Sequence, residues 1–231
     1  MKLIKHRIAL PGKRHFLFLW IAVLVFACAK KEKITGVDPA FSRYIDGYTS
    51  GVISKASVIR VRLSAETPVT HVLNEAIKEP LFSFSPSVKG KAYWTDARTI
   101  EFKPDGYLDP GRLYTVDFKL GKVTDVPDAF RNFVFNVQAM QPAFQVRENG
   151  LKVTGNSKEM MTLTGTVETA DMESSATVEK LLTAAYQGQS PVITWEHNGA
   201  ARTHQFTIAN IKRSATVSTL KLKWDGALLG L

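Results

Sequence analysis

The chain has 231 residues, of which 45% are hydrophobic and 22% are charged, and it contains one cysteine. This composition can supply hydrophobic cores for one large domain or two ordinary ones, and it excludes a wholly disordered chain. A single cysteine excludes a disulfide framework and a zinc site built from four thiolates. The formal net charge of +9 raises the question of a nucleic-acid or membrane partner.

The positive charge is concentrated at the N-terminus. Residues 1–27 contain five basic residues and no acidic residue, so they hold +5 of the +9 and leave +4 for residues 28–231. Residues 30–33 hold a further +2, which leaves +2 for the rest of the chain. Phosphate binding requires basic residues clustered on a folded surface, so we expect no nucleic-acid partner.

The N-terminal segment resembles the signal of a bacterial lipoprotein. Its basic residues precede an uncharged apolar run at residues 16–27, which is shorter than the roughly 20 residues that a membrane-spanning helix needs. The run ends at Ala27, directly before Cys28, the single cysteine. Val25-Phe26-Ala27-Cys28 resembles a lipobox, in which cleavage between Ala27 and Cys28 is followed by lipid attachment to the Cys28 sulfur. The alternative is an ordinary buried cysteine in an uncleaved anchor helix.

We therefore expect four segments along the chain. Residues 1–27 are predicted to be the signal peptide, and residues 28–48 a lipidated tether without periodicity. Residues 49–140 and 141–231 are predicted to be two β-sandwich domains, of which the second is truncated. Two or more lipid chains on Cys28 anchor a protein stably, so the expected location is a bacterial envelope membrane, the outer membrane facing the periplasm or the surface.

Residues 49–140 show the period of two that is typical of antiparallel strands. Tyr114 is expected to begin a strand and to tie its hydroxyl back to the preceding corner, which contains Leu108, Pro110 and Gly111. This role makes Tyr114 a core residue rather than a catalytic one, and Trp94 is likewise expected in the core or at a sheet edge. Strands are predicted at residues 57–63, 99–102, 114–120 and 133–138.

The second module is also predicted to consist of strands, with one short helix as the exception. Residues 144–153 predict a hairpin around Asn149-Gly150, because both residues tolerate the positive φ of a tight turn. Ser174 or Ser175 could cap a short helix, although a crossover between strands could also contain the same residues. The apolar residues at helical spacing are Val178, Leu181, Leu182 and Ala185. Further strands are predicted at residues 163–168, 192–196, 202–211 and 220–224, which makes the fold class all-β with two consecutive antiparallel sandwiches.

The sequence lacks the motifs of several enzyme classes. It contains no glycine-rich phosphate loop and no G-x-S-x-G elbow. His71, His197 and His204 are not spaced as a helical pair of metal ligands. Cys28 is expected to be acylated and so is not a nucleophile. We therefore expect no catalytic residue, no metal site and no cofactor, and we expect the chain not to be an enzyme.

The order of the sandwich motifs carries a family resemblance. The first module contains S-V-I-R-V-R-L-S-A at residues 57–65, F-S-P-x-V-x-G at residues 84–90 and W-x-D-x-R-x-I-x-F-x-P at residues 94–104. The second contains L-T-G-x-V at residues 163–167 and L-x-L-x-W-x-G at residues 220–226. Together with the lipobox, these motifs resemble the N-terminal portion of bacterial alpha-2-macroglobulin family lipoproteins, over about residues 45–231.

Members of that family are envelope proteins built from many macroglobulin-like sandwiches, and they trap proteases with a bait segment and often a Cys–Gln thioester. The resemblance implies that this chain is a non-catalytic, membrane-tethered scaffold of an endopeptidase inhibitor, with proteases or other envelope proteins as partners. The single cysteine, Cys28, does not belong to a C-x-E-Q thioester motif, and the chain has no room for a bait region. We therefore expect it to be an interrupted chain.

Two alternatives remain open. A surface lipoprotein could bind glycans or partner proteins through exposed aromatic residues, for which Trp94, Tyr107 and Trp195 are the candidates. The chain could also be the N-terminal module of an envelope enzyme.

Overall fold

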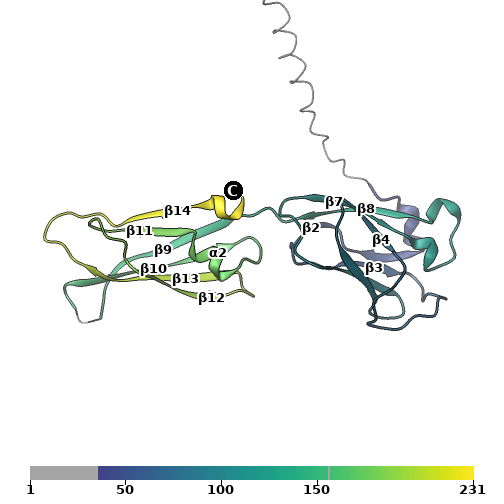
Figure 1. The fold of residues 1–231 in the computed structure, drawn as a ribbon, viewed down its shortest axis with the longest axis horizontal. Coiled ribbons are helices and arrows are strands. Elements are labelled where there is room, and N and C mark those ends of the chain that lie inside the picture. The colour runs from purple at the N-terminus through teal and green to yellow at the C-terminus, as the bar shows by residue number, and fades with distance from the viewer. Residues whose placement is uncertain (1–35, 156) are drawn as a thin grey trace, which may run out of the picture. The chain divides into compact units, whose positions relative to one another are not determined.

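The computed structural model describes residues 36–155 and 157–231, which belong to one compact unit. Ala27, Cys28 and the predicted signal peptide lie outside the described residues. The described part contains fourteen strands in four sheets and one short α-helix (Figure 1). The predicted all-β fold class is therefore confirmed. No helix among the described residues combines the length and apolar character needed to cross a membrane.

Two four-stranded sheets contain the strands of the first sandwich. The first sheet has the order β1-β3-β6-β5, and the second has the order β2-β8-β7-β4. All neighbours are antiparallel except β2 and β8, which run parallel. The strands are β1 (Ile45–Tyr48), β2 (Gly51–Ile53), β3 (Ile59–Leu63), β4 (Phe82–Ser85), β5 (Gly90–Trp94), β6 (Thr99–Pro104), β7 (Leu113–Phe118) and β8 (Phe133–Ala139).

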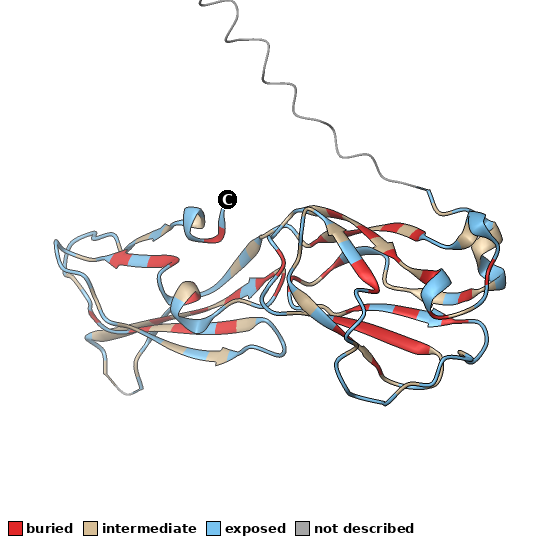
Figure 2. Ribbon diagram, turned by 45° about the vertical axis from the view of Figure 1, so that its right-hand side comes forward, coloured by how far each residue is buried: buried red, intermediate tan, exposed pale blue. Residues whose placement is uncertain are grey.

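Alternation along each strand produces the first hydrophobic core. In β3, Ile59, Val61 and Leu63 are buried while Arg60 and Arg62 are exposed, as period-two patterning predicts. β7 and β8 alternate in the same way from the opposite sheet, so the two inner faces meet (Figure 2). Short 3-10 turns at Leu120–Lys122 (η2) and Asp128–Phe130 (η3) connect β7 to β8.

Part of the segment predicted to be a tether belongs to this sandwich. Asp38 caps a 3-10 turn at Pro39–Arg43 (η1), and Ile45–Tyr48 pair with β3 as β1. Ile45 is buried in the core, and the ring of Phe41 packs edge-on against Phe133. Within β1 the burial does not alternate cleanly, and a register shift precedes Gly47. The period-two alternation that identifies other strands in the sequence is therefore absent from β1.

A four-stranded sheet and a two-stranded sheet surround the second core. Their orders are β12-β13-β10-β9 and β11-β14, with antiparallel neighbours throughout. The strands are β9 (Phe144–Val153), β10 (Met160–Thr169), β11 (Leu182–Ala185), β12 (Ile193–Asn198), β13 (Thr203–Lys212) and β14 (Lys221–Trp224), and a 3-10 turn at Gly226–Leu229 (η4) follows. Phe206 and Ile208 of β13 are fully buried at the centre of this core.

The predicted hairpin at Asn149-Gly150 is wrong. Residues 144–153 form one continuous strand, β9, along β10. Glu148 lies opposite Gly165 and Leu151 lies opposite Leu163, so the two residues Asn149 and Gly150 face a single residue of β10. Gly150 has φ +74°. A β-bulge of the G1 type and a tight type I′ turn both favour a glycine at positive φ, so the dipeptide does not distinguish them.

The predicted helix is present but shorter than its apolar spacing suggested. The helix α2 covers Ser175–Glu179, and Ser174 caps it by accepting a hydrogen bond from the Thr177 N–H. Val178 lies inside the helix and is fully buried. Leu182 and Ala185 instead belong to β11, whose pairing with β14 outweighs a weak local helical preference.

Candidate functional site

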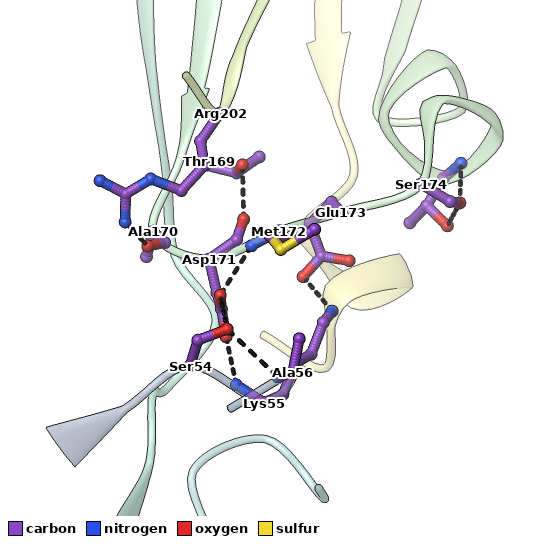
Figure 3. Close-up of polar contacts among 11 residues, drawn as sticks. Ser54, Lys55, Ala56, Thr169, Ala170, Asp171, Met172, Glu173, Ser174 and Arg202 are labelled. Carbon is purple, nitrogen blue, oxygen red and sulfur yellow. Dashed lines mark hydrogen bonds and ion pairs between the residues drawn. The ribbon is translucent and has the colours of Figure 1, made fainter. Parts of the chain in front are cut away.

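The loop that follows β2 meets the loop that follows β10 in a buried polar cluster (Figure 3). The buried cluster consists of Ser54, Lys55, Asp171 and Glu173. We call it, together with the exposed ring of Tyr107 beside Lys55, the joint. It brings together residues that are 116 to 118 positions apart in the sequence. One loop leaves a strand of the first sandwich, and the other leaves a strand of the second.

The carboxylate of Asp171 is the centre of the joint. Its Oδ1 accepts hydrogen bonds from the Ser54 hydroxyl at 2.6 Å and the Met172 N–H at 2.8 Å, and its Oδ2 accepts one from the Lys55 N–H at 2.7 Å. Asp171 is only 6% exposed. Burial raises the pKa of Asp171, but the hydrogen bonds from Ser54, Lys55 and Met172 outweigh burial and hold this pKa below its ordinary value. The carboxylate is therefore ionised at neutral pH.

A buried lysine completes the joint. Lys55 Nζ donates to Glu173 Oε1 at 2.8 Å, and the two side chains are 11% and 13% exposed. The same ammonium group lies 5.5 Å from the centre of the Tyr107 ring, which places a cation over an aromatic face. The Lys55 carbonyl accepts from the Leu108 N–H at 2.9 Å, so the loop that carries Tyr107 is fixed to the same point. The buried charges of Lys55 and Glu173 therefore compensate each other, as burial of charged groups requires.

The segment that carries Asp171 is itself held by the second sandwich. The Thr169 hydroxyl donates to the Asp171 carbonyl at 2.7 Å, and Arg202 Nη1 donates to the Ala170 carbonyl at 2.6 Å. The Thr169 N–H in turn donates to the Arg202 carbonyl at 3.0 Å. These bonds hold the backbone on which Asp171 is carried. The geometry is that of a positioned structural linkage, because each carboxylate oxygen of Asp171 already accepts a hydrogen bond.

A pair of histidines lies at one end of the second sandwich. His197 on β12 is the register partner of His204 on β13, and their Nδ1 atoms are 2.8 Å apart. His197 Nε2 lies 3.1 Å from Glu179 Oε1, at the last residue of α2. His204 is 1% exposed, and its Nε2 has no hydrogen-bond partner among the described residues. Burial lowers the pKa of His204, the neighbouring His197 lowers it further, and Glu173 opposes both effects.

The three aromatic candidates for ligand binding lie in different places. Trp94 is 4% exposed in the first core, where His71 stacks on it with ring centres 4.3 Å apart. Trp195 is half-buried and packs against Phe206 in the second core. Tyr107 is 69% exposed and belongs to the joint. The structure therefore does not bring the three together.

Neither the joint nor the histidine pair was predicted from the sequence. No local pattern in the sequence singles out Asp171 or Glu173, and none identifies Lys55 as their partner. The strands predicted at residues 192–196 and 202–211 do not place His197 opposite His204. The two histidines become partners because β12 ends at Asn198 and β13 begins at Thr203, which centres the hairpin between them.

The remaining predictions concern the N-terminus, metal binding and Tyr114. Cys28 and Ala27 lie outside the described residues. Among the residues that are described, no group of three or more His, Cys, Asp or Glu side chains could hold a metal ion. The position expected for Tyr114 is confirmed, since its hydroxyl accepts a hydrogen bond from the Asp109 N–H at 2.9 Å.

Comparison with known proteins adds little to this geometry. No family model matches the chain, and no curated protein matches it. Among solved structures, L,D-transpeptidase 3 from Mycobacterium tuberculosis is 15% identical, with 52% of this chain and 44% of that chain covered and a TM-score of 0.29. A further L,D-transpeptidase from Mycobacterium tuberculosis is 13% identical, with 67% and 59% covered and a TM-score of 0.31. The chain thus spans about half the length of these proteins, and similarity this low supports no statement about function.

Proposed function

We propose that the chain is a non-catalytic, membrane-tethered scaffold of the bacterial envelope, the N-terminal portion of an alpha-2-macroglobulin-like protease inhibitor. In this proposal the lipid on Cys28 holds the protein at the membrane. The two β-sandwiches then support the inhibitor as a spacer with a defined geometry, and no described residue needs a catalytic role.

The joint is the observation that carries this proposal. A spacer that only needs length can connect its modules through a solvated, flexible linker. Here Asp171 and Glu173 are buried against Ser54 and Lys55, although burial of charged groups is unfavourable unless each is paired. Such a contact restricts the two loops to one arrangement, and that restriction is what a scaffold requires.

Lipid attachment is tested by labelling cells that express the full chain with radioactive palmitate. We expect label on the wild type and on Lys30→Ala, a matched control two residues beyond the attachment site, and no label on Cys28→Ala. Undiminished label on Cys28→Ala would refute the anchor, because the chain has no other cysteine.

The scaffold role is tested by limited proteolysis of the full chain. We expect residues 140–143, which connect β8 to β9, to resist cleavage in the wild type and to be cleaved in Asp171→Ala. Asp105→Ala, at an exposed carboxylate in the β6–β7 loop, is the matched control and should resist like the wild type. Rapid cleavage of the wild type at these residues would contradict a fixed linkage.

The inhibitor role needs a test in cells. A strain without the gene should be more sensitive to added protease, and the wild-type gene should restore resistance. Cys28→Ala should fail to restore it, because the inhibitor would no longer be held at the membrane. Equal sensitivity with and without the gene would count against this part of the proposal.

A further inference from the structure

The histidine pair has a geometry that limits where hydrogen atoms can be placed. His197 Nδ1 and His204 Nδ1 are 2.8 Å apart, so one hydrogen fits between them and a second does not. His197 Nε2 faces Glu179 Oε1 at 3.1 Å, and because a carboxylate only accepts, this nitrogen carries a hydrogen. These two hydrogens are the complete set of the neutral pair.

The neutral arrangement follows directly. His197 has its hydrogen on Nε2, so its Nδ1 is bare and accepts from the Nδ1–H of His204. His204 Nε2 is then a bare nitrogen, buried and without a partner among the described residues. A bare ring nitrogen in an apolar environment is tolerated far better than an N–H group that lacks an acceptor.

A third hydrogen has one place left, His204 Nε2. A proton added to that atom creates a buried N–H without a described acceptor. A proton added to His197 Nδ1 displaces the shared hydrogen and moves the His204 hydrogen to Nε2, with the same result. Every protonated state of the pair therefore conflicts with the present packing around His204.

Two connections, one along the chain and one through a hydrogen bond, join this pair to the joint. The first is the segment of residues 171–179, because Ser174 caps α2 directly after Glu173 and Glu179 ends the helix at His197. The second is the start of β13, where Arg202 donates to the Ala170 carbonyl two residues before His204. These contacts give a shift of His204 or Glu179 a route to the backbone on both sides of Asp171.

The titratable groups that influence the protonation of His204 come from β12, from α2 and from the loop before α2. On β12, His204 faces His197, and beyond that Glu179 of α2. Glu173, on the loop before α2, raises the pKa of His204 and so opposes the effects of burial and His197, and it already accepts from Lys55 Nζ.

We propose that the His197–His204 pair is a pH-sensitive lock on the joint, closed while both imidazoles are neutral and opened when the pair takes up a proton. At neutral pH the pair supports α2 and the Asp171 segment. In acid the protonated pair repacks, α2 shifts, and the Lys55–Glu173 and Asp171 contacts weaken. The lock does not depend on the lipid anchor or on the inhibitor role.

Hydrogen exchange of the full chain in detergent, measured by mass spectrometry from about pH 7.5 to about pH 5, tests this proposal. After correction for intrinsic exchange, peptides covering residues 53–58 and 169–175 should lose protection as the pH falls, by up to about tenfold per pH unit below the ordinary histidine pKa. His204→Gln should remove this pH dependence. His71→Gln is the matched control, because His71 stacks on Trp94 in the first sandwich, and it should behave like the wild type.

A second measurement needs no variant at His204 and covers the case in which His204→Gln does not fold. The ring-carbon NMR signals of the wild type report the tautomer, and we expect a hydrogen on Nδ1 and none on Nε2 of His204 at neutral pH. Protection at the joint that is independent of pH in the wild type would overturn the proposal. The same pH dependence in folded His204→Gln, or a hydrogen on His204 Nε2 at neutral pH, would also overturn it.

Discussion

The hydroxyl oxygen of Tyr114 accepts a hydrogen bond from the backbone N–H of Asp109 at 2.9 Å. The bond spans five residues and closes the corner through which the chain enters β7. The ring of Tyr114 is 3% exposed, so one side chain both fills the core and satisfies a backbone donor in the loop.

Tyr114→Phe should therefore destabilise the first sandwich by about 1 kcal/mol, because the ring stays in place while the Asp109 N–H loses its acceptor. Urea denaturation of the full chain followed by circular dichroism measures the change. Tyr107→Phe is the matched control. The hydroxyl of Tyr107 belongs to an exposed ring, so its removal should change the free energy of unfolding by less than about 0.5 kcal/mol. Equal effects of the two substitutions would contradict the role given to the corner.

The ion pair of the joint should show strong coupling in a double-mutant cycle. Lys55→Met alone leaves the Glu173 carboxylate buried without its cation, and we expect a loss of about 3 kcal/mol. Adding Glu173→Met should recover much of that loss, because the second change removes the uncompensated charge. The exposed pair Lys122–Glu79, with side chains 43% and 53% exposed, is the control and should couple by no more than about 1 kcal/mol. Additive effects at the joint would show that its charges are solvated.

The ionised Asp171 should make the free energy of unfolding decrease as the pH falls into the acid range. Its folded pKa lies below its ordinary value of 3.8, so its stabilising effect is fully present above pH 3.8 and is lost as the pH falls through the folded pKa. Asp171→Asn should be less stable at neutral pH, since one amide oxygen replaces two acceptors. Its stability should also fall less steeply in acid than that of the wild type. Thermal denaturation at a series of pH values tests this, with Asp105→Asn as the control at an exposed carboxylate.

Gly165→Ala should destabilise the second sandwich by about 2 kcal/mol. A Cβ at this position would lie 2.8 Å from the Arg147 carbonyl oxygen and would overlap the buried ring of Phe206, so backbone and core would both have to move. Gly47 is also a strand glycine, but a Cβ there would meet nothing within 4 Å. Gly47→Ala should therefore be nearly neutral in the same urea experiment. A neutral result for Gly165→Ala would show that β10 is not held closely against β9 and β13.

Four strands of the first sandwich, β3, β6, β7 and β8, and the Tyr114 corner could be read from the sequence because their signals are local. Alternating residues such as Ile59, Val61 and Leu63 have one face that must leave water, so the period alone identifies the strand. The residues Leu108, Pro110 and Gly111 before Tyr114 form a corner for similar reasons. Each of these features depends on residues within about ten positions of one another.

Other features could not be read because two structures satisfy the same local preference. Asn149-Gly150 suits a bulge in β9 as well as a turn, and only pairing with β10 selects the bulge. Leu182 fits a helix by spacing, yet pairing with Trp224 places it in β11. The strand β1 was not predicted because its own residues show no regular alternation, and it is pairing with β3 that makes it a strand.

The sequence by itself determined the single cysteine that directs the proposed lipid anchor and the alternation that makes the fold all-β. Only the tertiary structure brought Asp171 to Ser54 and Lys55, and paired His204 with His197 around a nitrogen that has no described partner. The physical reason is that patterning records which face of a strand avoids water. The partner of a buried charge is decided by which loops meet, and the joint connects loops 116 residues apart.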